Sequence, residues 1–181
     1  PADIVSGEYY AGVVADAESY IGDADRADNV GWSSFPVNVR NATDTGPDLV
    51  ICGLSVPAFE GLRPGEHPQV QQGDQIEMSV CMTNAGNEPT LDASVELFLS
   101  RDTVVDDGDV SIFARTGQTL GQGDRFEETL DVDVPIDLEL GAWYVLAVVD
   151  RADAIEEQSE DNNLRATTDP IEIVAPGEAE G

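Results

Sequence analysis

The sequence contains no lysine, and its eight basic residues, all arginine, stand against 37 acidic ones. The formal net charge is −29 at pH 7. This charge argues against nucleic-acid binding and against contact with anionic membranes, because like charges repel. Such a surface stays soluble in high salt or beside divalent cations. Codon bias towards arginine together with ordinary solubility explains the composition equally well.

Histidine occurs once, as His67 in a loop rich in proline and glycine. No nucleophile elbow, zinc-ligand set or phosphate-binding glycine loop accompanies it. A surface-loop histidine is therefore the simpler interpretation, and we expect no catalytic residues and no enzymatic activity. The sequence also lacks the roughly 18–20 consecutive apolar residues that span a bilayer, and it lacks a basic segment followed by an apolar one at its start. We expect a mature or excised chain without membrane insertion.

Only two cysteines are present, so one intramolecular bridge at most can form. In the apolar alternation of residues 76–83, Cys81 falls on the face that points away from the core. Simple parity turns Cys52 inward, but Gly53 is typical of a β-bulge that would turn Cys52 outward, beside Cys81. We therefore expect a Cys52–Cys81 disulfide, which fits an oxidising, extracellular location. Two buried free thiols are the alternative.

Apolar residues recur with a period of two, in short runs separated by Gly, Asp, Asn and Pro, and no long run has helical periodicity. This pattern predicts an all-β chain with two packed antiparallel sheets. The expected strands are 49–56, 76–83, 93–100, 110–114, 125–134, 142–150 and 163–174.

An internal repeat decides the domain organisation. Residues 7–39 align without gaps with residues 141–173, so that Gly7 matches Gly141 and Pro36 matches Pro170. We therefore expect residues 1–40 to be the C-terminal hairpin of a preceding or partial copy, 41–46 a linker, 47–174 a complete domain and 175–181 an acidic tail or linker. An isolated hairpin is marginal in water. It would pack on its own complete domain or be completed by strands from another copy, unless the sequence is cut from a longer repeat protein.

Four carboxylates lie close together in one loop between two expected strands. Calcium takes six to eight oxygen ligands, so an acidic loop with a glycine is one way to bind it. The spacing is not that of an EF-hand, and a solvated turn whose Asp side chains cap backbone amides is the alternative. The candidate calcium ligands are Asp102, Asp106, Asp107 and Asp109.

A second acidic segment precedes the last expected strand, and we interpret it as a solvated turn rather than a cation site. Its carboxylates are Asp150, Asp153, Glu156, Glu157, Glu160 and Asp161. The adjacent pair Asn162 and Asn163 is expected to stabilise this turn through hydrogen bonds from the side chains to the backbone.

Aromatic residues occupy adjacent positions in both copies, as Tyr9-Tyr10 and Trp143-Tyr144. In each pair one ring faces the core and the other faces outward. We expect Tyr144 in the core and Trp143 at a contact between domains. The full set of candidate interface residues is Tyr9, Trp32, Phe35 and Trp143.

Six motifs, in order and at sensible spacing, resemble those of the CARDB domain, a cell-adhesion-related domain of bacteria and archaea. The resemblance covers residues 47–174 in full and 1–40 in part. It implies an immunoglobulin-like two-sheet β-sandwich, without catalysis, found in tandem in large surface and secreted proteins, sometimes beside hydrolase domains. The motifs are Pro47-Asp48-Leu49-Val50, Gly73-Asp74, Asn84-Ala85-Gly86, Leu97 to Asp102, Gly141 with Tyr144 and Asp150, and Glu157 to Asn163.

These observations together predict a secreted or cell-surface structural or adhesion module. It would be a repeat or subunit of a surface fibre or adhesin that contacts other copies or neighbouring repeats head to tail, or a surface glycan or protein. An accessory, carbohydrate-binding module of a secreted hydrolase is the alternative.

Overall fold

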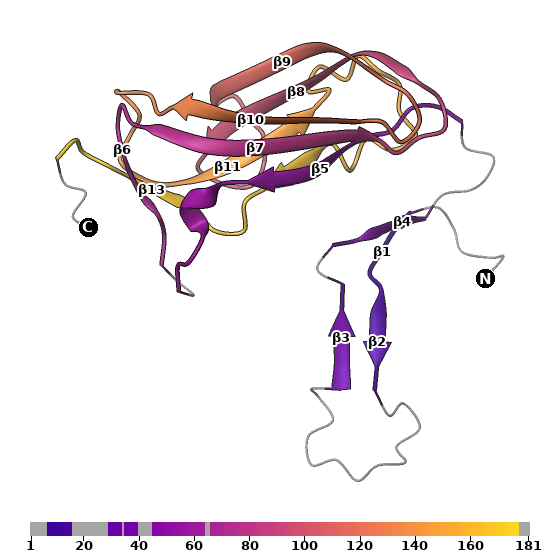
Figure 1. Ribbon diagram of the computed structural model, residues 1–181, viewed down its shortest axis with the longest axis horizontal. Helices are drawn as coiled ribbons and strands as arrows, with labels where there is room; N and C mark the ends of the chain where they lie inside the picture. The colour runs from indigo at the N-terminus through magenta and orange to yellow at the C-terminus, as the bar shows by residue number, and fades with distance from the viewer. Residues whose placement is uncertain (1–6, 16–28, 34, 40–44, 64–65, 178–181) are drawn as a thin grey trace. The chain divides into compact units, whose positions relative to one another are not determined.

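The computed structural model describes residues 7–15, 29–33, 35–39, 45–63 and 66–177. The chain divides into two compact units, Pro1–Asp44 and Thr45–Gly181 (Figure 1). The expected hairpin of residues 1–40 lies partly outside the described residues.

The second unit consists of two sheets (Figure 1). One has the strand order β10-β7-β5. The other has the order β6-β13-β11-β8-β9, with β12 also paired to β11. The strands are β5 (Leu49–Ser55), β6 (Gln69–Gln71), β7 (Gln75–Asn84), β8 (Thr90–Ser100), β9 (Val110–Leu120), β10 (Arg125–Asp133), β11 (Gly141–Val149), β12 (Leu164–Ala166) and β13 (Ile171–Val174), and a short 3₁₀ helix spans Pro57–Phe59.

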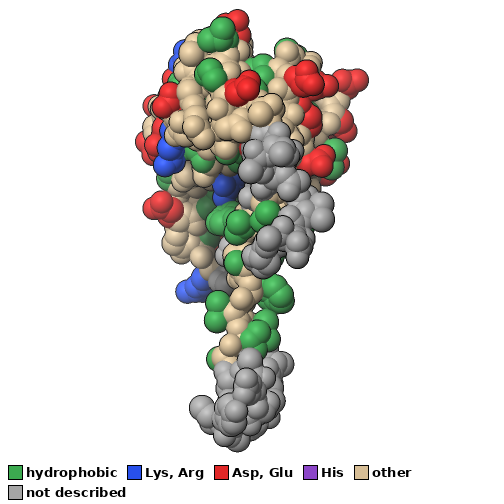
Figure 2. Space-filling view, turned by 90° about the vertical axis from the view of Figure 1, so that its right-hand side faces the viewer, with side chains coloured by type: hydrophobic (Ala, Val, Ile, Leu, Met, Phe, Trp, Pro, Cys, Tyr) green, Lys and Arg blue, Asp and Glu red, His purple; other side chains and the backbone are tan. Residues whose placement is uncertain are grey.

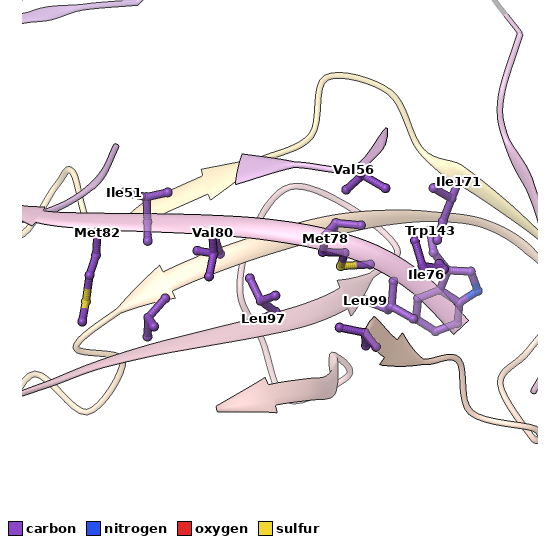
Figure 3. Packing of buried hydrophobic residues seen from close by; sticks show 14 of the residues in the cluster. Ile51, Val56, Ile76, Met78, Val80, Met82, Leu97, Leu99, Trp143 and Ile171 are labelled. Atoms are coloured by element: carbon purple, nitrogen blue, oxygen red, sulfur yellow. The ribbon is translucent and has the colours of Figure 1, made fainter. Parts of the chain in front are cut away.

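The main core lies between the two sheets and is built from alternate residues of their strands. On β7 the residues that face the core are Ile76, Met78, Val80 and Met82, which pack in one cluster with Leu97 and Leu99 of β8 (Figure 3). Because successive residues of a strand point to opposite faces, each of these strands contributes every second side chain.

A smaller apolar cluster covers the opposite face of the larger sheet. It consists of Phe98, Leu146 and Val148, with Tyr144 and Ala166 packed against it. The Arg151 guanidinium lies 4.5 Å from the centre of the Phe98 ring. These residues alternate with the core residues of β8 and β11, so both faces of these central strands are covered.

The expected all-β, immunoglobulin-like sandwich is confirmed, with differences in detail, one of which is that the strand expected over 110–114 extends to residue 120. Strand β6 and the 3₁₀ helix were not expected, and β6 pairs with β13 in parallel. The single strand expected over 163–174 is two strands, β12 and β13. Between them, the Thr167 amide donates to the Val145 carbonyl, and the Thr167 hydroxyl accepts a hydrogen bond from the Val145 amide. Pro170 has no amide hydrogen to continue the ladder.

The predicted bulge and the predicted disulfide are both confirmed. The register between β5 and β7 shifts between Ile51 and Gly53, so that Gly53, not Cys52, lies opposite Cys81. Cys52 and Cys81 form a disulfide with their Cα atoms 5.2 Å apart. The Arg125 guanidinium donates a hydrogen bond to Cys81 Sγ at 3.1 Å.

The described part of the first unit consists of two short two-stranded ladders. Strand β1 (Gly7–Tyr9) pairs with β4 (Val37–Val39), and β2 (Gly12–Val14) pairs with β3 (Val30–Trp32), both antiparallel. Apolar side chains are exposed along these ladders, whereas acidic side chains are spread over the surface of the second unit (Figure 2).

Candidate functional site: a polar clasp and an acidic pocket

A network of polar side chains fixes the segment by which the chain begins the sandwich. Asp48 and Leu49 in this segment are fully buried. We call the network the polar clasp. Its members are Asp48, Asn84, Asn87, Glu157, Gln158, Asn162 and Asn163.

Asn84, at the end of β7, uses all of its hydrogen-bonding capacity in the clasp. Its side-chain oxygen accepts the amides of Asp48 at 3.1 Å and Gly86 at 3.0 Å. Its side-chain nitrogen donates to the carbonyls of Glu88 at 2.7 Å and Leu120 at 3.1 Å. Buried polar groups need such partners, so this residue bonds four backbone groups at little desolvation cost.

Gln158 attaches the acidic turn to the same leading segment. Its backbone amide donates to the Pro47 carbonyl at 2.9 Å, and its side chain donates to the Gly46 carbonyl at 2.7 Å and to Asn87 Oδ1 at 2.9 Å. Asn87 Oδ1 also accepts the Gly46 amide at 3.0 Å. The backbone of residues 46 and 47 is thereby bonded to two separate loops.

Glu157 and the asparagine pair complete the clasp. The Glu157 carboxylate accepts hydrogen bonds from the Leu49 amide and, at 3.1 Å, from Asn163 Nδ2. Asn162 Nδ2 donates to Asp48 Oδ1 at 3.1 Å. The asparagines were expected to bond the backbone of their own turn. Asn162 instead donates to a carboxylate just before β5, and Asn163 donates to the carboxylates of Glu157 and Glu160 within its own turn.

Burial raises the pKa of Glu157 to about 7, and the negative charges of Glu160 and Asp150 add to this rise. The hydrogen bonds from Leu49 and Asn163 act in the opposite direction. This carboxyl therefore keeps its proton to a higher pH than an ordinary glutamate does.

Gly86 allows the close backbone approach that the clasp requires. A Cβ atom at this position would lie 2.4 Å from the Gly46 carbonyl oxygen and 2.7 Å from the Asp48 nitrogen. Any larger residue must displace backbone rather than a mobile side chain. This close approach explains why glycine occupies the last position of the Asn84-Ala85-Gly86 motif.

A pocket of about 630 Å³ brings the two acidic segments together. The loop after β8 contributes Asp106 and Asp107, and the turn after β11 contributes Asp150, Asp153, Glu160 and Asp161. No local pattern indicates that these segments meet, because 43 residues separate Asp107 from Asp150 and the loops meet only when β8 pairs with β11.

The four predicted calcium ligands mostly cap their own loop. Asp102 Oδ1 accepts the Val104 amide at 2.8 Å, Asp106 Oδ1 accepts the Gly108 amide at 2.6 Å, and Asp109 Oδ2 accepts the Asp106 amide at 2.9 Å. Among the described residues, no three His, Cys, Asp or Glu side chains are grouped so that they could hold a metal ion. The side chains as placed do not fit a metal, and calcium binding stays a prediction.

Trp143 and Tyr144 occupy the reverse of their expected environments. Trp143 is 5% exposed within the main core, where its indole nitrogen donates to the Glu139 carbonyl at 2.8 Å and Arg101 lies 4.0 Å over its ring. Tyr144 packs on the opposite face. The expected inter-domain role of Trp143 is therefore wrong. His67 is exposed, as a surface-loop residue is.

The remaining predicted interface residues are all exposed in the first unit. Tyr9 is 40%, Trp32 68% and Phe35 61% exposed. Their role at an interface stays a prediction.

A sequence profile of the CARDB family matches residues 46–167. The chain belongs to the CARDB family. Two solved structures of the CARDB domain of PF1109 from Pyrococcus furiosus have a similar fold. A crystal structure in complex with di-metal ions has a TM-score of 0.52 and 19% identity, covering 74% of this chain and 99% of that one. A solution structure has a TM-score of 0.51 and 18% identity, covering 72% and 97%. No curated protein gives a significant match.

CARDB domains are cell-adhesion-related and non-catalytic. The disulfide agrees with an oxidising environment. In the described part of the chain, no helix is long and apolar enough to cross a bilayer.

Proposed function

We propose that this protein is a non-catalytic, load-bearing structural module of an extracellular, cell-surface assembly such as an adhesin or fibre. The observation that carries the proposal is the double anchoring of β5, the strand by which the chain begins the CARDB sandwich. The polar clasp bonds the residues just before β5, and the disulfide joins β5 to β7. Membership of a cell-adhesion-related family supports the extracellular setting.

Tension along a tandem chain enters the sandwich at residue 45. It must first break the bonds of Gln158 and Asn84 to the leading segment. It then reaches Leu49–Ile51, the residues of β5 that precede the disulfide. Beyond Cys52 the strand cannot be peeled from β7 without breaking a covalent bond. This arrangement shields the residues between the two cysteines from tension, as a module that transmits force requires.

Single-molecule stretching of the full chain, with handles attached at both ends, tests the proposal. The oxidised protein should unfold at a higher force than the reduced one. Reduction should also lengthen the released chain by about 100 Å, since 29 residues separate the cysteines and an extended residue spans about 3.3–3.6 Å. A Cys52→Ser, Cys81→Ser variant should behave like the reduced protein under both conditions. Equal unfolding forces for oxidised and reduced protein would contradict a load-bearing role.

Divalent-cation binding at the acidic pocket is a second proposal, supported by the gathering of two acidic loops there. The Pyrococcus furiosus CARDB crystal structure contains di-metal ions. Because no three carboxylates converge in the described residues, side chains would have to move. We therefore expect weak affinity, with a Kd of about 10⁻⁴–10⁻³ M, as in other extracellular modules. Calcium titration by calorimetry should show binding that Asp107→Asn weakens and that Asp131→Asn, away from the pocket, leaves unchanged.

An accessory, carbohydrate-binding role is the alternative, favoured by the exposed rings of Tyr10, Trp32 and Phe35. Exposed aromatic rings can stack on sugars. Glycan binding that is lost in a Trp32→Ala variant would support it, and the absence of binding across a glycan panel would leave the structural role.

A further inference from the structure

The two ladders of the first unit have the same register as the last strands of the CARDB sandwich. An offset of 134 residues, from Gly7 to Gly141, converts every backbone pair of β1–β4 into a pair of β11–β13, and every pair of β2–β3 into a pair of β11–β12. The matching pairs are Gly7/Val39 with Gly141/Ile173, Glu8/Asn38 with Ala142/Glu172, Tyr9/Val37 with Trp143/Ile171, Gly12/Trp32 with Leu146/Ala166, Val13/Gly31 with Ala147/Arg165, and Val14/Val30 with Val148/Leu164.

Hydrogen bonds at the break between the ladders match as well. The Ala11 amide donates to the Ser33 hydroxyl at 3.0 Å, as the Val145 amide donates to the Thr167 hydroxyl at 3.2 Å. The Ser33 amide donates back to the Ala11 carbonyl at 2.7 Å. A sequence alignment alone does not require this agreement, because a one-residue slip would reverse every side chain.

In one matching pair, the large and the small side chain lie on opposite strands in the two units. In the complete domain, a large Leu146 lies opposite a small Ala166 in the outer cluster. In the first unit, Gly12 lies opposite Trp32, and a Cβ on Gly12 would lie 2.7 Å from the Trp32 ring. In both pairs a large side chain faces a small one, but Trp32 is 68% exposed whereas Leu146 is fully buried.

The first unit differs from the complete domain in what covers it. Val13 is 72% exposed, whereas its counterpart Ala147 is fully buried in the main core. Val30 and its counterpart Leu164 are almost equally exposed, at 40% and 39%. Val13 is therefore exposed at the position where, in the second unit, β8 and the opposite sheet cover Ala147. Among the described residues, β2 pairs only with β3, whereas β11 also pairs with β8.

We propose that the first unit is the C-terminal part of a second CARDB sandwich, and that the edge of residues 10–15 pairs with a strand equivalent to β8. That strand and its sheet would be supplied by a CARDB segment of the same polypeptide. A second copy of this chain does not offer one, because both edges of its β8 are already occupied, by β9 and β11. Trp32 then packs against the counterpart of Phe98, and Val13 enters the core.

A fusion tests the proposal, using this chain's own strands as the probe. Residues 45–140 are placed directly before Gly7, so that a second set of β5–β10 precedes the first unit. Hydrogen exchange of the backbone amides in residues 10–15 should slow by about 100-fold or more relative to the unfused chain. Acrylamide quenching of Trp32 should fall. The fusion should remain monomeric by light scattering.

Matched variants distinguish docking from a general effect of the added segment. Val13→Glu should abolish the protection in the fusion and leave the unfused chain unaffected, whereas Val30→Glu should change neither. Val14→Cys should form a disulfide when combined with Glu96→Cys of the added segment, because Val148 pairs with Glu96 in the complete domain. It should not do so when combined with Ser94→Cys.

Three results would overturn the proposal. The edge could stay unprotected in the fusion, the crosslink from position 14 could form equally well with positions 94 and 96, or the unfused chain could already be protected in a concentration-dependent oligomer. The last result would assign the edge to a second copy. None of these results depends on whether the module bears load.

Discussion

Glu157 should make the stability of the sandwich fall as pH rises through the neutral range. Its pKa is raised to about 7 in the folded protein, from an ordinary value of 4.5. The folded state therefore binds a proton that the unfolded state has already released. The stabilisation is fully present below about pH 4.5 and is lost as pH rises to about 7.

The size of this effect follows from the pKa difference and from partial burial. The difference between a pKa of 4.5 and one of about 7 corresponds to roughly 3.5 kcal/mol, at about 1.4 kcal/mol for each tenfold change in proton affinity. Because Glu157 is only half-buried, solvent screening reduces this figure, and we expect about 1–1.5 kcal/mol.

Urea unfolding at pH 5 and pH 8, for the natural chain and Glu157→Gln, measures this contribution. A glutamine side chain cannot ionise, so the variant should lose about 1–1.5 kcal/mol less stability between the two pH values. Glu156→Gln is the matched control, because it removes the same charge from the exposed neighbouring residue and should keep the natural pH dependence. An unchanged pH dependence in the Glu157→Gln variant would refute the reasoning.

Two further predictions concern the anchoring of β5. Reducing the Cys52–Cys81 disulfide should lower the free energy of unfolding by about 3.5 kcal/mol, the loop-entropy expectation for a separation of 29 residues, and a loss below about 1 kcal/mol in a denaturant titration would contradict it. Gly86→Ala should cost about 2–3 kcal/mol, because its Cβ would meet the Gly46 carbonyl oxygen at 2.4 Å. A thermal melt unchanged from that of the natural chain would show that the leading segment is free to move.

Local sequence patterns were sufficient to predict most strands and the disulfide. Alternation along residues 76–83 placed Cys81 on the outer face, and Gly53 marked the bulge that turned Cys52 towards it. The same reasoning failed for Trp143 and Tyr144. Adjacency fixes that the two rings point to opposite faces, but both faces of β11 are covered, and the larger ring lies in the main core.

The sequence by itself determined what depends on near neighbours: the all-β class, the bulge, the cysteine pairing and the repeat that relates residues 7–39 to 141–173. Only the tertiary structure decided what depends on distant residues. The polar clasp joins Asp48 to Asn84, 36 residues away, and to Asn162, 114 residues away. The acidic pocket likewise joins two loops that meet through the pairing of β8 with β11. The period-two alternation of a strand determines which face each residue lies on. Which residues contact that face depends on how the sheets and loops pack.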